Sequence, residues 1–261
     1  MSVFTASYPI HTYEADANGR APFAAIFRFL QDIAAQHAVK IGYGLDDLKE
    51  NAHMWVLSRF LYRAHRIPRW QEVLEIETWP SGTQRLFALR DWIIRNSSGE
   101  EVAIATSSWV VVDIEKRTPV RIERVAERLE MIVDRHLFDR SPTKLPTYDL
   151  SGLSLSTTAT FADMDLNAHV NSTRYVEWMF NTLPDRFLEA GNVLREIEIN
   201  FNGESRAGDE LGIFTERGPT PTHHLEPESV EFHHSVIKKI DGSIVCRARS
   251  LWNRVLDGDK S

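Results

Sequence analysis

An internal repeat is the strongest constraint on the fold, because the chain presents the same order of predicted elements twice. Residues 23 to 38 carry apolar side chains at helical spacing after Pro22. Four strand-like runs follow: "WVLSRFLYRAH", "EVLEIETWPSG", "RLFALRDWIIRN" and "EEVAIATSSWVVVD". Residues 171 to 183 again predict a helix, which Pro184 ends, before the runs "LREIEINFN", "DELGIFTE", "SVEFHHSVIKKIDG" and "SIVCRARSLWNRVLD". A separation of roughly 140 residues relates the two halves.

Each half therefore predicts an α+β unit in which an antiparallel sheet wraps one long helix. We expect the two sheets to join edge to edge, because a lone sheet of this kind would leave a hydrophobic edge exposed. Two independent α+β domains are the alternative. The expected division is an N-terminal repeat at residues 1–125, a linker at 126–150 that ends in polar sequence with prolines, and a C-terminal repeat at 151–261.

The bulk composition argues against several classes of function. A net charge of −7 opposes general binding to nucleic acids or anionic membranes, while 43% hydrophobic residues supply a well-buried interior. The single cysteine, Cys246, rules out an internal disulfide and a cysteine-based zinc site, and it fits a reducing compartment. Because neither a signal-like start nor a run of about 18 apolar residues occurs, we expect a cytoplasmic protein without a membrane anchor.

The stretch "DMDLNAHVNST", residues 163–173, combines three side chains that can handle protons or orient a carbonyl group. Asp165, Asn167 and His169 recur at every second position, so in an extended segment they would all face one way. The helix predicted from Val170 onward would add unpaired N–H groups and its positive dipole end, which stabilise developing negative charge. The pattern therefore predicts a catalytic edge.

Two structural interpretations compete with this one. Asp163, Asp165 and Asn167 match the first three ligand positions of an EF-hand calcium loop, but Ala168 replaces the glycine of its sharp turn and Arg174 replaces its bidentate glutamate. A helix cap would explain an Asp or Asn here, although it would not explain a histidine in phase with them.

The repeat offers a way to choose between a catalytic and a structural role. Aligning the two predicted helices pairs Ala17 with the Asp of this stretch. The same alignment pairs Gly19 with the Asn and Ala21 with the His. The strand alignment sets Ile67 opposite Glu204. The first copy then has apolar or absent side chains at all four places, which favours a single reaction site in the second half.

Six segments of the chain carry a resemblance to a known family: "YEADANGRAPFAAIFRFLQDIAAQHA", "WVLSRF", "EVLEIETWPSG", "RDWIIRNSSGEEVAIATSSWVVVD", "DMDLNAHVNSTRYVEW" and "EINFNGES". They resemble the fatty acyl-acyl carrier protein thioesterases of plants and bacteria, whose fold is a tandem double hotdog. The resemblance covers nearly the whole chain. It implies a thioester hydrolase that releases free fatty acid from acyl-acyl carrier protein and so terminates fatty acid synthesis, with no cofactor and no metal.

The resemblance also implies site residues, because that family places its catalytic Asp, Asn and His in a D-x-N-x-H-V-N stretch and a further Glu on a strand soon after. The matching positions are Asp165, Asn167, His169 and Glu204. One of the two carboxylates would activate water or attack the thioester directly, the amide would stabilise or orient the carbonyl group, and the histidine would carry a proton to the departing thiol. Many members carry a Cys directly after the matching Glu, whereas this chain has Ser205, so we do not expect a cysteine thiolate mechanism.

The expected partner is an acyl carrier protein that bears a fatty acyl thioester. Arg59, Arg63, Arg66 and Arg69 form a basic run on an acidic protein, which is either a solvated face or a docking patch for an acidic carrier. The apolar residues of the first helix are mainly core, but side chains of the same kind line acyl-chain pockets. We expect such a pocket in the non-catalytic first repeat.

Several alternatives stay open from the sequence. A hotdog-type dehydratase or hydratase acting on hydroxyacyl thioesters would use similar residues, and a non-enzymatic module that binds the acyl chain or the carrier would keep the pocket without the reaction. The pairs His223–His224 and His233–His234 favour solvated or core-lining histidines over a metal site, because adjacent strand residues face opposite ways. The sequence does not decide whether the outer faces pair in a homodimer.

Overall fold

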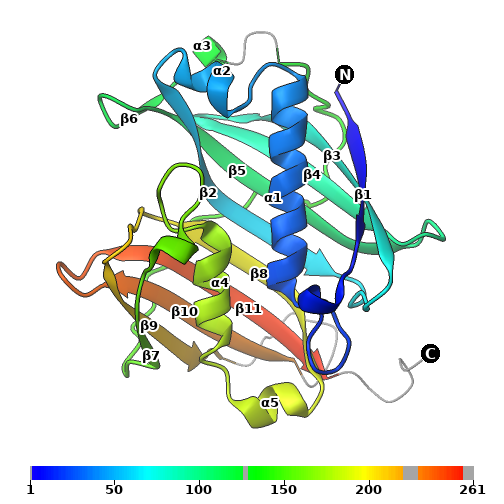
Figure 1. The fold of residues 1–261 in the computed structure, drawn as a ribbon, viewed down its shortest axis with the longest axis vertical. Coiled ribbons are helices and arrows are strands. Elements are labelled where there is room, and N and C mark those ends of the chain that lie inside the picture. Colours follow the sequence, from blue (N-terminus) through cyan, green and yellow to red (C-terminus); the bar gives the residue numbers. More distant parts are fainter. Residues whose placement is uncertain (1, 126–128, 220–228, 255–261) are drawn as a thin grey trace. The chain divides into compact units, whose positions relative to one another are not determined.

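The computed structural model describes residues 2–125, 129–219 and 229–254 and divides the chain into two compact units, Met1–Thr143 and Lys144–Ser261. In each unit a helix lies across one face of an antiparallel sheet (Figure 1). Within the described ranges, none of the helices has the length and apolar character needed to cross a membrane. The α+β class predicted for each half is confirmed, whereas the edge-to-edge joining of the two sheets stays a prediction.

The first unit builds its sheet in the order β1-β3-β4-β5-β2, with β6 paired to β5. Its elements are β1 (Phe4–Pro9), η1 (Thr12–Glu14), α1 (Phe23–Lys40), α2 (Leu45–Lys49), β2 (His53–Ala64), β3 (Val73–Gln84), β4 (Phe87–Arg95), β5 (Glu101–Asp113), β6 (Thr118–Val120) and α3 (Ile122–Val125). The long helix buries Phe27, Leu30 and Ile33, and the Trp92 indole Nε1 donates to the Leu30 carbonyl oxygen at 3.1 Å. Each such side chain contributes about 1.5–3 kcal/mol on burial, so this face fixes α1 on the sheet.

The second unit repeats this plan with the strand order β8-β11-β10-β9-β7. Its elements are β7 (Leu155–Thr158), η2 (Phe161–Asp163), α4 (Ser172–Phe180), α5 (Asp185–Glu189), β8 (Asn192–Phe201), β9 (Glu210–Arg217), β10 (Val230–Lys238) and β11 (Ile244–Arg254). The Asn171 side chain caps α4 by accepting from the Thr173 N–H, and the buried face of the helix includes Tyr175, Val176 and Met179. Both long helices and all eight strand-like runs predicted from the sequence are confirmed, except that residues 255–257 of the last run lie outside the described residues.

The segment expected as a linker is partly folded against the first unit. Ile132, Leu137 and Phe138 of this segment pack on the face of the sheet opposite α1, against a buried apolar cluster of Trp79, Ile93 and Ile104. The Trp79 indole Nε1 donates to the Arg135 carbonyl oxygen at 3.2 Å, which fixes the segment there. An apolar sheet face needs a cover, and this segment supplies it.

Candidate active site

Residues 165–169 form a tight turn, so the expectation of an extended segment is wrong. Asp165 Oδ1 accepts hydrogen bonds from the backbone N–H groups of Asn167 at 2.8 Å and of His169 at 3.2 Å. The Asp165 N–H donates to the His169 carbonyl oxygen at 2.7 Å, and Ala168 takes a left-handed φ of 56°. An Asp side chain that bonds the backbone two residues on closes a turn of this kind. Asp165 therefore shapes the turn that presents His169.

His169 and Glu204 are brought together, as the family resemblance implies. His169 Nε2 lies 3.0 Å from Glu204 Oε2, with 17% of the histidine side chain and 44% of the glutamate side chain exposed. Arg206 Nη2 lies 3.3 Å from Glu204 Oε1 and 3.4 Å from His169 Nε2. The arginine therefore supplies positive charge beside the carboxylate, and the pair is open to water.

The bond to Glu204 defines the roles of the two imidazole nitrogens. A neutral His169 that donates its Nε2 proton to the carboxylate carries an unprotonated Nδ1. Among the residues that the structure describes, none forms a hydrogen bond with this Nδ1. Such a nitrogen can accept a proton from water, and the carboxylate behind the ring can stabilise the resulting imidazolium.

A second group of bonds fixes Glu204 against the turn. Glu204 follows β8, and its neighbour Ser205 accepts a hydrogen bond through its carbonyl oxygen from the Val170 N–H at 2.8 Å. The Arg206 N–H donates to Asp209 Oδ2 at 2.9 Å, which closes the turn after the glutamate. The residue beside His169 is thus tied directly to the residue beside Glu204.

The backbone donors expected at the helix start are largely occupied. The helix α4 begins at Ser172 rather than Val170. The Val170 N–H donates to the Ser205 carbonyl oxygen, the Asn171 N–H to the Asp163 carbonyl oxygen at 2.8 Å, and the Thr173 N–H to the Asn171 side chain. These three groups are therefore not available to stabilise a carbonyl oxygen. The Asn167 side-chain amide forms no hydrogen bond with the residues described here, so it keeps its donors.

The first unit contains the same turn, which corrects the register of the repeat. Asp16 Oδ1 accepts from the Asn18 N–H at 2.8 Å and the Arg20 N–H at 2.9 Å, and the Asp16 N–H donates to the Arg20 carbonyl oxygen at 2.8 Å. Gly19 takes a left-handed φ of 69°, as Ala168 does in the second unit. The expected alignment with Ala17, Gly19 and Ala21 is therefore shifted by one residue. Two of the three polar side chains have identical counterparts, and only His169 is replaced, by Arg20.

The strand alignment holds. The Ala21 N–H donates to the Pro68 carbonyl oxygen at 2.8 Å, just as Val170 donates to Ser205. Ile67 therefore occupies the place of Glu204, as the sequence alignment predicts. Among the four predicted site residues, the two copies thus differ by a histidine and a glutamate against an arginine and an isoleucine.

The only cysteine is poorly suited to act as a nucleophile. Cys246 lies in β11 with 0% of the residue exposed, between Phe201 of β8 and Val236 of β10. Burial raises the pKa of its thiol, so the thiolate is disfavoured. These observations agree with the expectation from Ser205.

The arginine run is partly used inside the first unit. Arg59 donates to the Pro142 carbonyl oxygen at 3.2 Å, the Arg63 guanidinium lies 5.1 Å from the Phe138 ring centroid, and Arg66 forms a bidentate pair with Glu72. Arg69 is exposed. Much of the charge in this run therefore anchors residues 129–143 or pairs with an acid.

Of the two histidine pairs, His233–His234 lies within the described residues. His223 and His224 lie outside the described residues. His234 is fully buried, with its Nδ1 2.8 Å from Thr215 Oγ1 and its Nε2 2.8 Å from Ser250 Oγ, whereas His233 pairs with Glu231 at 2.7 Å. Across residues 2–125, 129–219 and 229–254, no three or more His, Cys, Asp or Glu side chains gather in a way that could hold a metal ion.

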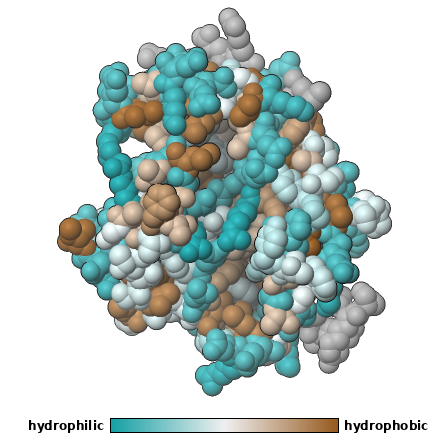
Figure 2. All heavy atoms as spheres, viewed as in Figure 1, coloured by the Kyte–Doolittle hydropathy of each residue, from teal (hydrophilic) through white to brown (hydrophobic). Residues whose placement is uncertain are grey.

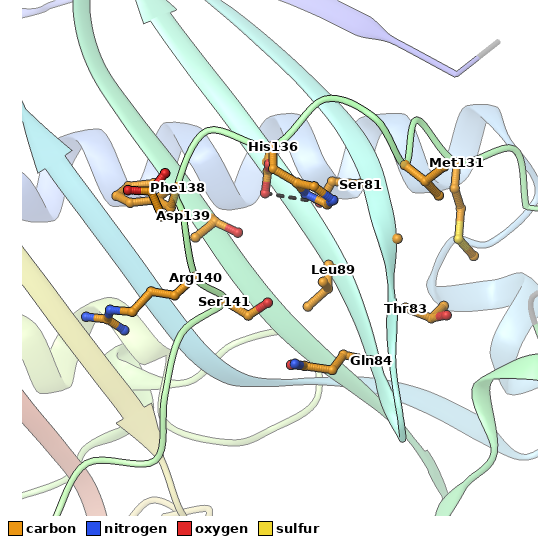
Figure 3. A pocket seen from close by; sticks show the side chains of 14 residues that line it. Ser81, Thr83, Gln84, Leu89, Met131, His136, Phe138, Asp139, Arg140 and Ser141 are labelled. Carbon is orange, nitrogen blue, oxygen red and sulfur yellow. Dashed lines mark hydrogen bonds and ion pairs between the residues drawn. The ribbon is translucent and has the colours of Figure 1, made fainter.

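A cavity of about 390 Å³ belongs to the first unit, between its sheet and residues 131–141 (Figure 3). Asp91 lines this cavity, accepts from the Ser81 hydroxyl at 3.0 Å, and lies 3.9 Å from His136 Nδ1. Burial raises the pKa of Asp91, and hydrogen bonds from Thr106 and Ser81 oppose that rise. These polar groups satisfy one another, and no sequence motif points to them.

Comparison with known families places both halves of the chain in one family. The acyl-ACP thioesterase N-terminal domain matches residues 1–128, and the acyl-ACP thioesterase C-terminal domain matches residues 152–254. The two matches divide the chain much as the internal repeat does.

Individual relatives agree with these matches. The chain is 26% identical over 279 residues to oleoyl-acyl carrier protein thioesterase 1, chloroplastic, from Arabidopsis thaliana, covering 95% of this chain and 75% of that protein. An acyl-ACP thioesterase from Bacteroides thetaiotaomicron VPI-5482 has a similar structure, with a TM-score of 0.77, 27% identity and coverage of 96% of this chain and 98% of that one. The 12:0-ACP thioesterase from Umbellularia californica shares the fold, with a TM-score of 0.82, 23% identity and coverage of 96% and 94%.

Proposed function

The chain belongs to the acyl-ACP thioesterase family, and we propose that His169 and Glu204 form the pair with which it hydrolyses the thioester of an acyl carrier protein and releases free fatty acid. The observation that carries this proposal is the 3.0 Å contact between the two side chains, together with its replacement by Arg20 and Ile67 in the first copy. The tandem double hotdog of the family supplies the scaffold on which only one copy carries the pair.

In the proposed reaction His169 acts first as a base. Its Nδ1 removes a proton from a water molecule, whose oxygen attacks the thioester carbonyl carbon, while Glu204 stabilises the imidazolium through Nε2. When the tetrahedral intermediate collapses, the C–S bond breaks and the imidazolium returns the proton to the departing thiolate. The products are a fatty acid and the free thiol of the carrier, and no other reactant is needed.

The two remaining residues have supporting roles in this proposal. The Asn167 side-chain amide would donate to the carbonyl oxygen as negative charge develops on it. Asp165 would hold the turn, because its Oδ1 already accepts two backbone N–H groups. This division assigns water activation to the histidine and its partner glutamate rather than to Asp165.

We also propose that the first repeat is non-catalytic and binds the acyl chain. Its long helix presents a large apolar face, and its loop carries Arg20 where the second repeat carries His169. Aliphatic and aromatic side chains of this kind line pockets for fatty chains. The linker at residues 126–150 would then connect a binding unit to a reacting unit.

Docking of the carrier protein on the arginine run stays a proposal, and Arg69 is its best-supported member. Arg69 is exposed, whereas Arg59, Arg63 and Arg66 make the contacts described above. On the face drawn in Figure 2, hydrophobic residues form small separate groups among hydrophilic ones, which favours recognition by charge rather than by one broad apolar patch. Pairing into a homodimer and a cytoplasmic location also stay predictions.

Thiol release from acyl carrier protein thioesters tests the catalytic pair. We expect His169→Ala and Glu204→Ala each to lower kcat by about 10²–10⁴, since an acid–base group contributes on that scale, with folding unchanged. Coenzyme A thioesters and a range of chain lengths in the same assay would define the substrate. Undiminished turnover by a folded Glu204→Ala protein would remove Glu204 from the mechanism.

A further inference from the structure

Three protic side chains lie buried next to the turn and strand end that carry His169 and Glu204. Tyr175 of α4 is 3% exposed, and Ser205 and Cys246 are both 0% exposed. Burial raises the pKa of the Tyr175 phenol, nearby Ser205 opposes that rise, and Cys246 adds to it. The three groups are therefore close neighbours in the core of the second unit.

Two of these groups, both hydroxyls, lack good hydrogen bonds. Neither the Tyr175 hydroxyl nor the Ser205 hydroxyl has a hydrogen-bond partner of good geometry among the described residues, although the two groups are near each other. The Cys246 thiol has one weak contact, 3.9 Å from the Arg247 carbonyl oxygen. A buried hydroxyl without a partner costs free energy that an apolar side chain would not, so its presence calls for an explanation.

The first unit shows that the fold does not require these groups. Tyr175 is the fourth residue of α4, and the fourth residue of α1 is Ile26. Pro68 replaces Ser205, because the two accept matching backbone hydrogen bonds. Cys246 pairs with the last residue of β8 and Ala103 pairs with the last residue of β2, so Ala103 replaces Cys246. All three replacements are buried and lack a protic side chain.

At these three matching places, protic side chains thus occur only in the copy that carries the reactive pair. Ser205 is bonded covalently to Glu204, and its carbonyl oxygen accepts from the Val170 N–H beside His169 at 2.8 Å. A rotation of the Ser205 residue would therefore move both members of the pair. The Tyr175 ring of α4 lies 6.4 Å from the ring of Phe201, the last residue of β8, four residues before Ser205, and Ser205 acts on the pKa of its phenol.

We propose that Tyr175 is a positioning residue for the reaction, which acts through Ser205 to hold His169 and Glu204 in register. The inference rests on the proposed function, because it assigns no chemistry to Tyr175 itself. Catalytic groups lose efficiency when their supporting contacts allow displacements of about 0.5 Å or more. An unsatisfied buried hydroxyl at this place lowers the folding stability of the second unit. The first unit has an apolar side chain there and does not incur this loss.

The test is Tyr175→Phe, which removes only the hydroxyl. We expect kcat for thiol release from an acyl carrier protein thioester to fall about ten-fold, with KM changed by less than about two-fold, because substrate binding is untouched. The Tm should stay the same or rise, because an unpaired buried hydroxyl is removed. Ser205→Ala should give a similar loss, and the double variant should lose no more than either single one, because both act through one contact.

The matched control is Tyr62→Phe, which removes another buried phenol hydroxyl, in the first unit, 2% exposed. It should leave kcat unchanged. An unchanged kcat in Tyr175→Phe, or an equal loss in Tyr62→Phe, would overturn the proposal; if Tyr175→Phe does not fold, the kcat of Ser205→Ala decides instead. His169→Ala distinguishes failure of the proposed function from failure of the positioning role. Full activity of His169→Ala would refute the proposed function. An inactive His169→Ala protein together with a fully active Tyr175→Phe protein would refute only the positioning role.

Discussion

The turn at residues 16–20 and the turn at residues 165–169 have the same backbone and different chemistry. In each an Asp carboxylate accepts two backbone N–H groups, and in each the fourth residue takes a left-handed conformation. The fifth residue is Arg20 in one and His169 in the other. Comparing them separates the residues that build the turn from the residue that can exchange a proton.

Much of the D-x-N-x-H pattern therefore builds the turn. Asp and Asn occur at matching places in both turns, so a copy without the His–Glu pair keeps them. The pair itself is present once. The Asp and Asn of the pattern therefore belong to a turn that both copies share, and the proposed function assigns the reaction to the two side chains found in one copy.

The largest expected effect comes from making the second turn like the first. His169→Arg replaces an imidazole, which can accept and return a proton, with a guanidinium that stays charged, so we expect kcat for thiol release to fall by about 10³ or more. Arg20→His is the matched control and should leave kcat within about two-fold, because Ile67 offers no carboxylate. Retention of more than a tenth of the activity by folded His169→Arg would contradict the proposed role.

A second difference concerns acid stability. His234 pairs with Thr215 and Ala248 where Trp92 of the first unit pairs with Thr78 and Ala105, so a titrating ring replaces one that does not titrate. Burial, with a smaller effect from His233, lowers the pKa of His234 from 6.5 to about 3. Between these pH values the unfolded chain binds a proton at this histidine that the folded chain does not. The contribution of His234 to the free energy of unfolding is therefore fully present above pH 6.5 and is lost as the pH falls towards 3.

The expected loss is about 2 kcal/mol in the free energy of unfolding between pH 7 and pH 5 from this group alone. Urea denaturation at the two pH values measures it. His234→Phe should lower stability at pH 7, since the hydroxyls of Thr215 and Ser250 each lose one hydrogen-bond partner, but it should flatten the dependence on pH. An equally steep dependence in the variant would assign the acid sensitivity to other groups.

The smallest effect tests the shared frame. Asp16→Ala and Asp165→Ala should each lower the free energy of unfolding by about 1 kcal/mol, because each removes a carboxylate that accepts two backbone N–H groups near the surface. Only Asp165→Ala should also lower kcat, modestly, because it loosens the turn that holds His169. Thermal or urea unfolding and thiol release measure the two effects. A loss of kcat as large as that of His169→Arg would instead indicate that Asp165 takes part in the chemistry.

Sequence periodicity was sufficient for the repeat, both long helices and the main strands, because long amphipathic segments carry their pattern in many residues. It missed the short elements β1, β6, β7, α2, α3 and α5, in which three to six residues carry too little pattern. The His–Glu contact followed from the family resemblance, since no periodicity relates residues 169 and 204.

The one-residue shift in the repeat has a physical cause. The side chains of Phe27 and Tyr175 are both large and buried, which favours pairing them, but Phe27 is the fifth residue of its helix and Tyr175 the fourth. The better signal was the turn itself, because "DANGR" and "DLNAH" share an Asp that closes it and a small residue at its left-handed position. Alternating polar residues indicate an extended segment, but hydrogen bonds from the Asp side chain to the backbone close residues 165–169 into a turn.

The cover that residues 129–143 form over Trp79 bears on how the molecule can be cut into pieces for study. A truncated product ending at residue 125, where the repeat ends by sequence, would lose the Arg135 carbonyl that accepts from Trp79 and would turn an indole and two isoleucines towards water. Such a product would be prone to self-association. A cut after Thr143 keeps that cover with its sheet and is the better starting point for expressing the halves separately.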